Sequence, residues 1–156
     1  MLEVLTFRDR SLLSAIAHDL CFDAAPMVRV EGAQVTVRCR VDGLRVRGKV
    51  TGGAVAQLAQ RDREQIEATL RREVLHAERN AEIVFEGELS AQGVHGSLQL
   101  NGRALPLELP ILASAGRVRG EVELVPSRWG VAPYSAMFGA LKVQDRVVVR
   151  FDLPLA

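Results

Sequence analysis

Residues 97–109 read SLQLNGRALPLEL, in which apolar residues alternate with others on both sides of Asn101-Gly102. A two-residue type I′ turn needs two positive φ angles, and Asn-Gly tolerates them best, so the segment predicts a β-hairpin. Pairing across this turn sets Leu98 opposite Leu105. The same register puts five apolar residues on one face: Leu98, Leu100, Leu107, Leu109 and Ile111. Turn chemistry and hydrophobic pattern therefore predict the same register.

The same period of two runs through most of the chain. Residues 117–124 read RVRGEVEL and residues 146–153 read RVVVRFDL, each with one apolar and one charged face. This pattern is typical of half-buried strands. We predict strands at 2–7, 12–22, 27–30, 34–41, 44–50, 83–89, 95–100, 104–111, 117–125 and 146–153. Asp42-Gly43 also reads as a hairpin turn between two of them.

One segment breaks this period. Ile66, Leu70 and Val74 lie four residues apart, which is the spacing of one helix face. Asp62 is a suitable N-cap residue just before them. The sequence therefore predicts a single α-helix at about residues 63–77.

Length and composition fit one soluble globular domain spanning residues 1–156. The chain is 48% hydrophobic and 25% charged, with 156 residues in all, and a chain of this size buries enough surface to fold without a metal or a disulfide. Its net charge of +1 argues against a nucleic-acid partner that relies on a basic field.

The amino-terminal region and the two cysteines lead us to expect a cytoplasmic protein. Arg8, Asp9 and Arg10 interrupt the amino-terminal region, so no signal peptide is expected and we predict a cytoplasmic protein. The sequence lacks an apolar run of the roughly 18 residues needed for a spanning helix. Cys21 and Cys39 stand among apolar residues, and we predict two free buried thiols.

Many short strands with one helix favour a mainly β fold, either a closed antiparallel barrel or a sandwich. The abundant Arg and Glu residues reach water only if the apolar faces turn inward, which is the reverse of a membrane barrel. An interior of about eight strands is either filled by side chains or left open for one small ligand. A hollow interior predicts a binding protein, and a filled one predicts an interaction or stress-response module.

Four stretches together resemble the YceI-like family. They are LLSAIAHDL at 12–20, IEATLRREVLHAERNAEIVF at 66–85, GSLQLNGRALPLEL at 96–109 and RWGVAPYSAMFGALKVQDRVVVRFDL at 128–153. The resemblance implies an extended, eight-stranded, lipocalin-like antiparallel barrel with one helix and an elongated apolar pocket for a polyisoprenoid or isoprenoid quinone. It also implies one long bent strand through 34–50, in place of a hairpin at Asp42-Gly43. The chain differs from the family pattern in three ways. No export signal is expected, residues 63–66 read REQI where the family commonly has an Arg-Asp-x-His-Leu run, and Trp129 stands where a smaller aromatic residue is usual.

Residues 128–143 hold the only tryptophan and the only tyrosine. Gly130, Pro133 and Gly139 punctuate this segment as a loop, and loops at a barrel mouth commonly carry binding residues. The family resemblance favours ligand contact, and the alternative is that the aromatic residues plug the barrel as ordinary core. The predicted ligand-binding set is His18, Phe22, Phe85, Trp129, Tyr134, Met137, Phe138 and Leu141.

Histidines give little support to a metal site. The imidazole of His18 could bind a head group, but a histidine satisfied within the core is the more ordinary interpretation. His76 and His95 show no ligand spacing such as His-x-His. We therefore predict neither a metal nor another cofactor.

Four arginines suggest a charged surface. If Asp42-Gly43 formed a hairpin, Arg38 would face Arg47 and Arg40 would face Arg45, which is unfavourable without nearby anions. Neighbouring Glu side chains are the ordinary source of that anion. A pyrophosphate head group or an anionic membrane surface is the functional alternative. A homodimer is a further candidate partner.

The sequence shows no motif of an enzyme. It lacks a Gly-x-Ser-x-Gly elbow, a Cys-x-x-Cys pair and a phosphate-binding glycine loop. The prediction is therefore a non-catalytic carrier of an apolar lipid, with the filled-barrel module and a lipid-acting enzyme as the alternatives.

Overall fold

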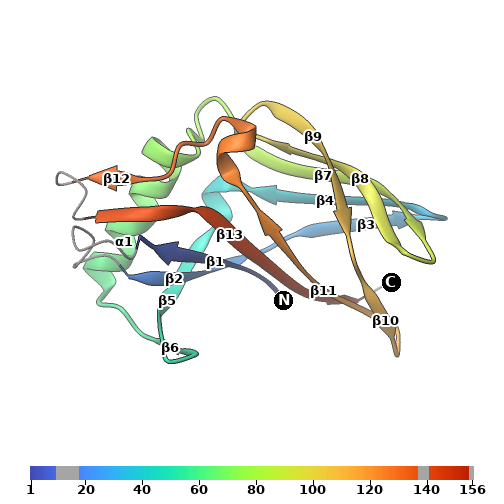
Figure 1. The fold of residues 1–156 in the computed structure, drawn as a ribbon, viewed down its shortest axis with the longest axis horizontal. Helices are drawn as coiled ribbons and strands as arrows, with labels where there is room; N and C mark the ends of the chain where they lie inside the picture. Colours follow the sequence, from blue (N-terminus) through green and yellow to red (C-terminus); the bar gives the residue numbers. More distant parts are fainter. Residues whose placement is uncertain (10–17, 137–140, 155–156) are drawn as a thin grey trace.

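The computed structural model of the chain describes residues 1–9, 18–136 and 141–154. Within these ranges the chain forms two antiparallel sheets and one α-helix (Figure 1), which confirms the predicted fold class. The eight-stranded sheet contains β1 (Leu2–Arg8), β2 (Asp19–Ala24), β5 (Arg45–Thr51), β6 (Ala54–Ala56), β10 (Leu112–Ser114), β11 (Arg117–Leu124), β12 (Ser135–Ala136) and β13 (Leu141–Pro154). The five-stranded sheet contains β3 (Met27–Glu31), β4 (Gln34–Arg40), β7 (Glu82–Ser90), β8 (Gly93–Leu100) and β9 (Arg103–Leu109).

The two sheets share one long bent hairpin. Its first arm runs from β2 into β3 and its second from β4 into β5, so β2 pairs with β5 in one sheet and β3 pairs with β4 in the other. The chain bends at Pro26 on one arm and at a 3₁₀ turn, Val41–Gly43, on the other. The expected barrel of eight strands is thus realised as two sheets of eight and five strands around a common interior.

Asp42-Gly43 is not a hairpin turn, which corrects one prediction. Neither residue has the positive φ of a type I′ turn, and β4 and β5 do not pair with each other. Val41 and Leu44 are instead buried in the core, at 1% and 7% exposure. Burying these two side chains outweighed the local turn preference.

The hairpin at Asn101-Gly102 is confirmed in detail. The φ angles of the two residues are 53° and 72°, both positive as a type I′ turn requires. In the ladder between β8 and β9, Leu98 lies opposite Leu105. The five apolar residues predicted on one face all line the interior.

The helix begins earlier than predicted. Helix α1 spans Gln60–Thr69 and continues into a π-helical turn, Leu70–Val74. Its N-cap is Ala59, so the assignment of Asp62 as N-cap was wrong. The Arg63 amide donates to the Ala59 carbonyl at 3.0 Å, which places Asp62 inside the first turn. Within the described residues, no helix is both long and apolar enough to cross a bilayer.

The short strands escaped prediction. β6, β10 and β12 are two or three residues long, too short for an alternating pattern to be seen. The start of the predicted strand 12–22 lies outside the described residues, and its later part forms β2. β13 begins five residues before the predicted strand 146–153, because its first residues pair with β12.

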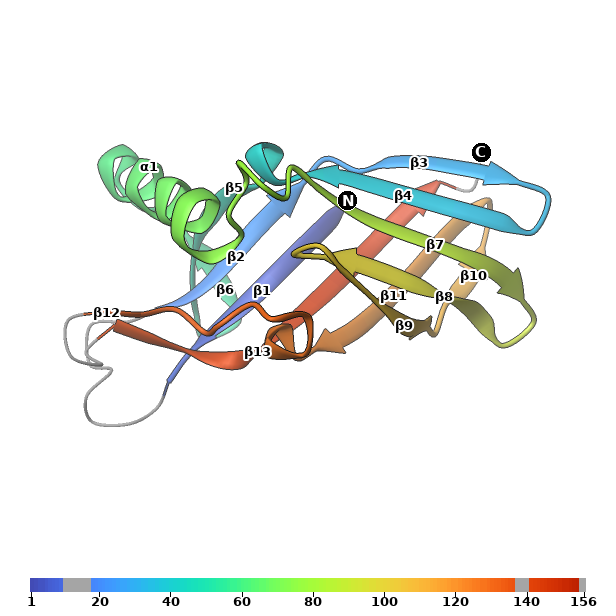
Figure 2. The same ribbon diagram turned by 90° about the horizontal axis from the view of Figure 1, so that it is seen from above.

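The elements leave the molecule with two distinct ends. In both views, α1 and β12 lie at one end and the β3–β4 hairpin lies at the other (Figure 2). The buried core packs between the sheets and contains Val41, Leu44, Leu75, Phe85, Val94, Leu98, Leu100, Leu124, Trp129 and Val131.

Candidate functional site: an elongated apolar cavity

The inner faces of both sheets surround a cavity of about 750 Å³. Alternate residues of β1, β2, β3, β4, β7, β8, β9 and β11 point into it, because side chains alternate across a strand. On β13 the lining residues extend from Lys142 to Pro154, which is roughly 40 Å at about 3.3 Å per residue. The interior is therefore hollow, and the filled-barrel alternative loses its structural basis.

The two ends of the cavity differ in polarity. Near the β3–β4 end the lining is aliphatic and aromatic, with Val28, Val30, Ile111 and Phe151 among its residues. Near α1 the described part of the lining carries polar side chains: His18, Asp62, Gln65, Thr69, Tyr134, Lys142, Gln144 and Asp145. This asymmetry suits a molecule with one polar and one apolar end.

α1 and the turn after it border one end of the cavity. Ile66, Leu70 and Val74, the predicted apolar face, all line it. The Leu75 amide bonds the Leu70 carbonyl at 2.9 Å, which adds one residue to the last turn. The sequence revealed this apolar face through its spacing, but not that the face borders a cavity.

Four of the predicted ligand-binding residues lie on the cavity wall. Phe22 and Phe85 are buried, at 5% and 6% exposure, and both line the interior. Tyr134 lines the polar end. His18 also lines that end and is exposed, so its interpretation as a buried core histidine was wrong. Ligand contact by these residues stays a prediction.

Trp129 is a buried core residue, as in the alternative to ligand contact. It ends a 3₁₀ turn, Pro126–Trp129, and is 2% exposed. Its indole Nε1 donates to the backbone carbonyl of Leu98 at 2.9 Å. The residue is not part of the cavity lining, because this hydrogen bond holds the indole against β8.

The remaining predicted residues cannot be placed at the site. Met137 and Phe138 lie outside the described residues. Leu141 is the first residue of β13, but its side chain also lies outside what the structure describes.

The two free thiols lie on opposite faces of their sheets. Cys39 lines the cavity, whereas Cys21 points to the outer side of β2. Burial raises the pKa of each thiol to about 11. Both are therefore neutral and poorly nucleophilic at physiological pH.

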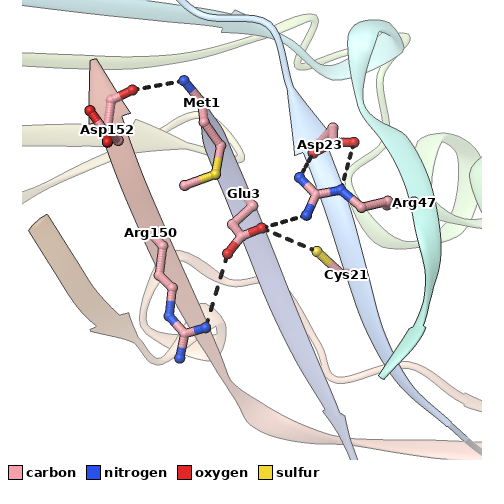
Figure 3. A network of polar contacts seen from close by, with 7 residues as sticks. All are labelled: Met1, Glu3, Cys21, Asp23, Arg47, Arg150 and Asp152. Carbon is pink, nitrogen blue, oxygen red and sulfur yellow. Dashed lines mark hydrogen bonds and ion pairs between the residues drawn. The ribbon is translucent and has the colours of Figure 1, made fainter. Parts of the chain in front are cut away.

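A polar network on the outer face binds β1 to its neighbours (Figure 3). The buried carboxylate of Glu3 accepts from Arg47 Nη1 at 2.8 Å and from the Cys21 thiol at 3.6 Å. Arg150 Nη1 lies 4.0 Å from the other oxygen of Glu3. Arg47 also pairs with Asp23 on β2. The Glu3 carboxylate on β1 therefore contacts side chains from β2, β5 and β13.

Each of the four arginines of the expected charged face has a partner within the chain, and that of Arg47 is the pair Glu3 and Asp23. Arg38 pairs with Glu82 on the adjacent strand at 3.3 Å, which is the ordinary source of anions that we predicted. Arg40 pairs with Asp42 at 2.7 Å, and Arg45 donates to the Asp42 carbonyl. Because β4 and β5 belong to different sheets, the predicted arrangement of facing arginines was wrong.

Metal coordination has no candidate in the described structure. Within residues 1–9, 18–136 and 141–154, no group of three His, Cys, Asp or Glu side chains is arranged to hold a metal ion.

Comparisons with known proteins identify the fold. The structure resembles that of Burkholderia cenocepacia BcnA, with a TM-score of 0.61 and 12% identity over 97% of this chain and 92% of that chain. It also resembles a Saccharophagus degradans domain described as polyisoprenoid binding and implicated in plant cell wall breakdown. In that case the TM-score is 0.59 and the identity 9%, over 97% of this chain and 90% of that chain.

The family follows from the sequence itself. A search of curated proteins finds no match. Residues 21–155 match the YceI-like domain family, and this match covers most of the chain, including the whole cavity-lining sheet of five strands. The chain is therefore a member of the YceI-like family.

Proposed function

We propose that the chain is a non-catalytic binding protein that carries a long isoprenoid lipid in its cavity. The observation that carries the proposal is the cavity of about 750 Å³, lined almost throughout by apolar side chains. Each CH₂ group moved from water into such a space gains about 0.8 kcal/mol, so an apolar chain binds with few polar contacts.

The polar end of the cavity supports an amphiphilic ligand. Gln65, Tyr134 and Lys142 supply hydrogen-bond donors beside α1, where a quinone or another oxygen-bearing head would lie. The apolar tail would then extend towards Val28 and Val30. The similarity to a domain described as polyisoprenoid binding favours an isoprenoid over other apolar chains.

Native mass spectrometry of protein purified without detergent tests the proposal. We expect an additional mass that corresponds to an isoprenoid lipid. In a Val37→Trp variant an indole would fill part of the cavity, because Val37 lines it, and the bound lipid should be lost. Thr36→Trp is the matched control, since Thr36 is the next residue along β4 and is not part of the cavity lining.

Two results would contradict the proposal. One is protein that remains unliganded after incubation with isoprenoid lipids. The other is equal lipid binding by the Val37→Trp variant and the wild type, which would place the lipid outside the cavity.

A further inference from the structure

β3 is the outermost strand of the five-stranded sheet and is exposed along its length. Within the described ranges it pairs with β4 alone. All five of its residues are exposed; Met27 is 65% exposed, whereas the side chains of Val28 and Val30 face the cavity. A strand edge with unpaired backbone groups is a template for another strand.

The other sheet edges carry protection that β3 lacks. β9 contains Pro106, which has no N–H group to donate to a ladder. β6 and β10, at the ends of the eight-stranded sheet, are only three residues long. β3 has five residues without proline, so it is the edge best able to accept a partner strand.

The turn after β3 determines which backbone groups face outward. Gly32 has φ of 61° and is the first central residue of the two-residue loop between Glu31 and Gln34, as in a type II′ turn. In that turn the Glu31 carbonyl bonds the Gln34 amide. Orientation alternates along the strand, so the N–H and C=O groups of Val28 and Val30 point away from β4.

The charges of β3 indicate a second copy of the same strand as the partner. Its two charged residues are Arg29 and Glu31, whose side chains are 76% and 66% exposed. Within the strand, Arg29 Nη2 lies 2.5 Å from Glu31 Oε1. About a two-fold axis at Val30, Arg29 of each copy lies opposite Glu31 of the other, giving two ion pairs across the interface. A register centred on Arg29 would instead set like charges opposite each other.

We propose that β3 forms a homodimer edge, in which β3 pairs antiparallel with β3 of a second copy and Val30 lies opposite Val30. The two Val30 residues exchange their outward N–H and C=O groups in two hydrogen bonds. The exposed Met27 side chains add apolar surface to the contact. The pairing uses backbone groups at the sheet edge, so the inference does not rest on the proposed lipid ligand.

Sedimentation velocity of the purified chain across a concentration series tests the proposal. We expect a monomer–dimer equilibrium whose dissociation constant rises at least about tenfold in Arg29→Glu, because this change sets like charges opposite each other twice. The double variant Arg29→Glu/Glu31→Arg should restore the wild-type constant. Val30→Pro should also abolish the dimer, since it removes an outward N–H group that β4 does not use.

The outcomes are distinct. A wild-type protein that stays monomeric at millimolar concentration would overturn the proposal, and so would an Arg29→Glu variant that dimerises like the wild type. Flotation of the monomer with lipid vesicles, lost in Met27→Asp, would assign the edge to a lipid surface and would also overturn it. Circular dichroism of each variant verifies that the monomer is folded.

Discussion

Trp129 shows how one hydrogen bond fixes the role of a side chain. The local sequence, with its glycines and proline, favoured a loop residue that contacts ligand. The structure instead buries the ring and bonds its N–H group to the Leu98 carbonyl. The backbone group that receives this bond lies 31 residues away in the sequence, so no local pattern could reveal it.

The Trp129→Phe substitution separates stability from binding. It removes the indole N–H group that donates to the Leu98 carbonyl, and we expect the free energy of unfolding to fall by about 1–3 kcal/mol. Lipid affinity should stay unchanged, because the indole is not part of the cavity wall. Urea unfolding and lipid titration measure the two quantities. A variant that loses affinity but keeps its stability would contradict the core assignment.

The cavity thiol makes stability depend on alkaline pH. The pKa of Cys39 is raised to about 11 by burial, whereas an unfolded thiol titrates near 8.5 to 9. The folded state therefore keeps a proton that the unfolded state loses. The stabilisation is complete below about pH 9 and is lost as the pH rises to 11, at about 2 to 3 kcal/mol for a shift of this size.

Replacing Cys39 tests this dependence. Cys39→Val keeps an apolar side chain of similar size beside Val35 and Val37 but cannot titrate. We expect a smaller loss of unfolding free energy between pH 9 and pH 11 than in the wild type, measured by urea unfolding at several pH values. Equal slopes in both proteins would show that the thiol does not carry the effect.

Strand periodicity placed some site residues correctly, and the loop at 128–143 placed Tyr134. Phe22 and Phe85 fall on the inner faces of alternating strands and do line the cavity. The rest of the polar end was missed because Asp62, Gln65 and Gln144 come from α1 and β13, far apart in the sequence. Only the folded chain brings them together.

Elements were predictable where local and long-range preferences agree. At Asn101-Gly102 the turn residues and the apolar register point to one structure, and the hairpin forms as predicted. At Asp42-Gly43 they conflict, since a tight turn would leave Val41 and Leu44 outside the core. There the core prevails, and the chain passes from one sheet to the other.

Glu3 holds β1 in the middle of the eight-stranded sheet. Glu3→Gln removes the charge that faces Arg47 and Arg150, and we expect a loss of about 1–3 kcal/mol in unfolding free energy. Glu121→Gln is the control, because Glu121 pairs with Arg150 but is 56% exposed, and it should cost less than about 1 kcal/mol. Urea unfolding compares the two, and hydrogen exchange should show faster opening of β1 only in Glu3→Gln. Equal losses in both variants would contradict a special role for Glu3.

At the scale of the whole molecule, a ligand in the cavity should stabilise the folded state. A ligand that binds only the folded state at 100 times its Kd adds about 2.7 kcal/mol. For a chain of this size we expect the Tm to rise by about 5 to 10 °C with a long isoprenoid alcohol, measured by calorimetry. The Val37→Trp variant should show little rise. An equal rise in both proteins would indicate that the lipid binds elsewhere.

The bond between Trp129 and Leu98 also gives the molecule an optical reporter. The side chain of Leu98 lines the cavity while its carbonyl accepts the indole N–H group. A lipid that presses on Leu98 must therefore disturb the surroundings of the chain's only tryptophan. The emission maximum and intensity of tryptophan fluorescence should therefore differ between the lipid-bound and lipid-free protein, without an attached dye.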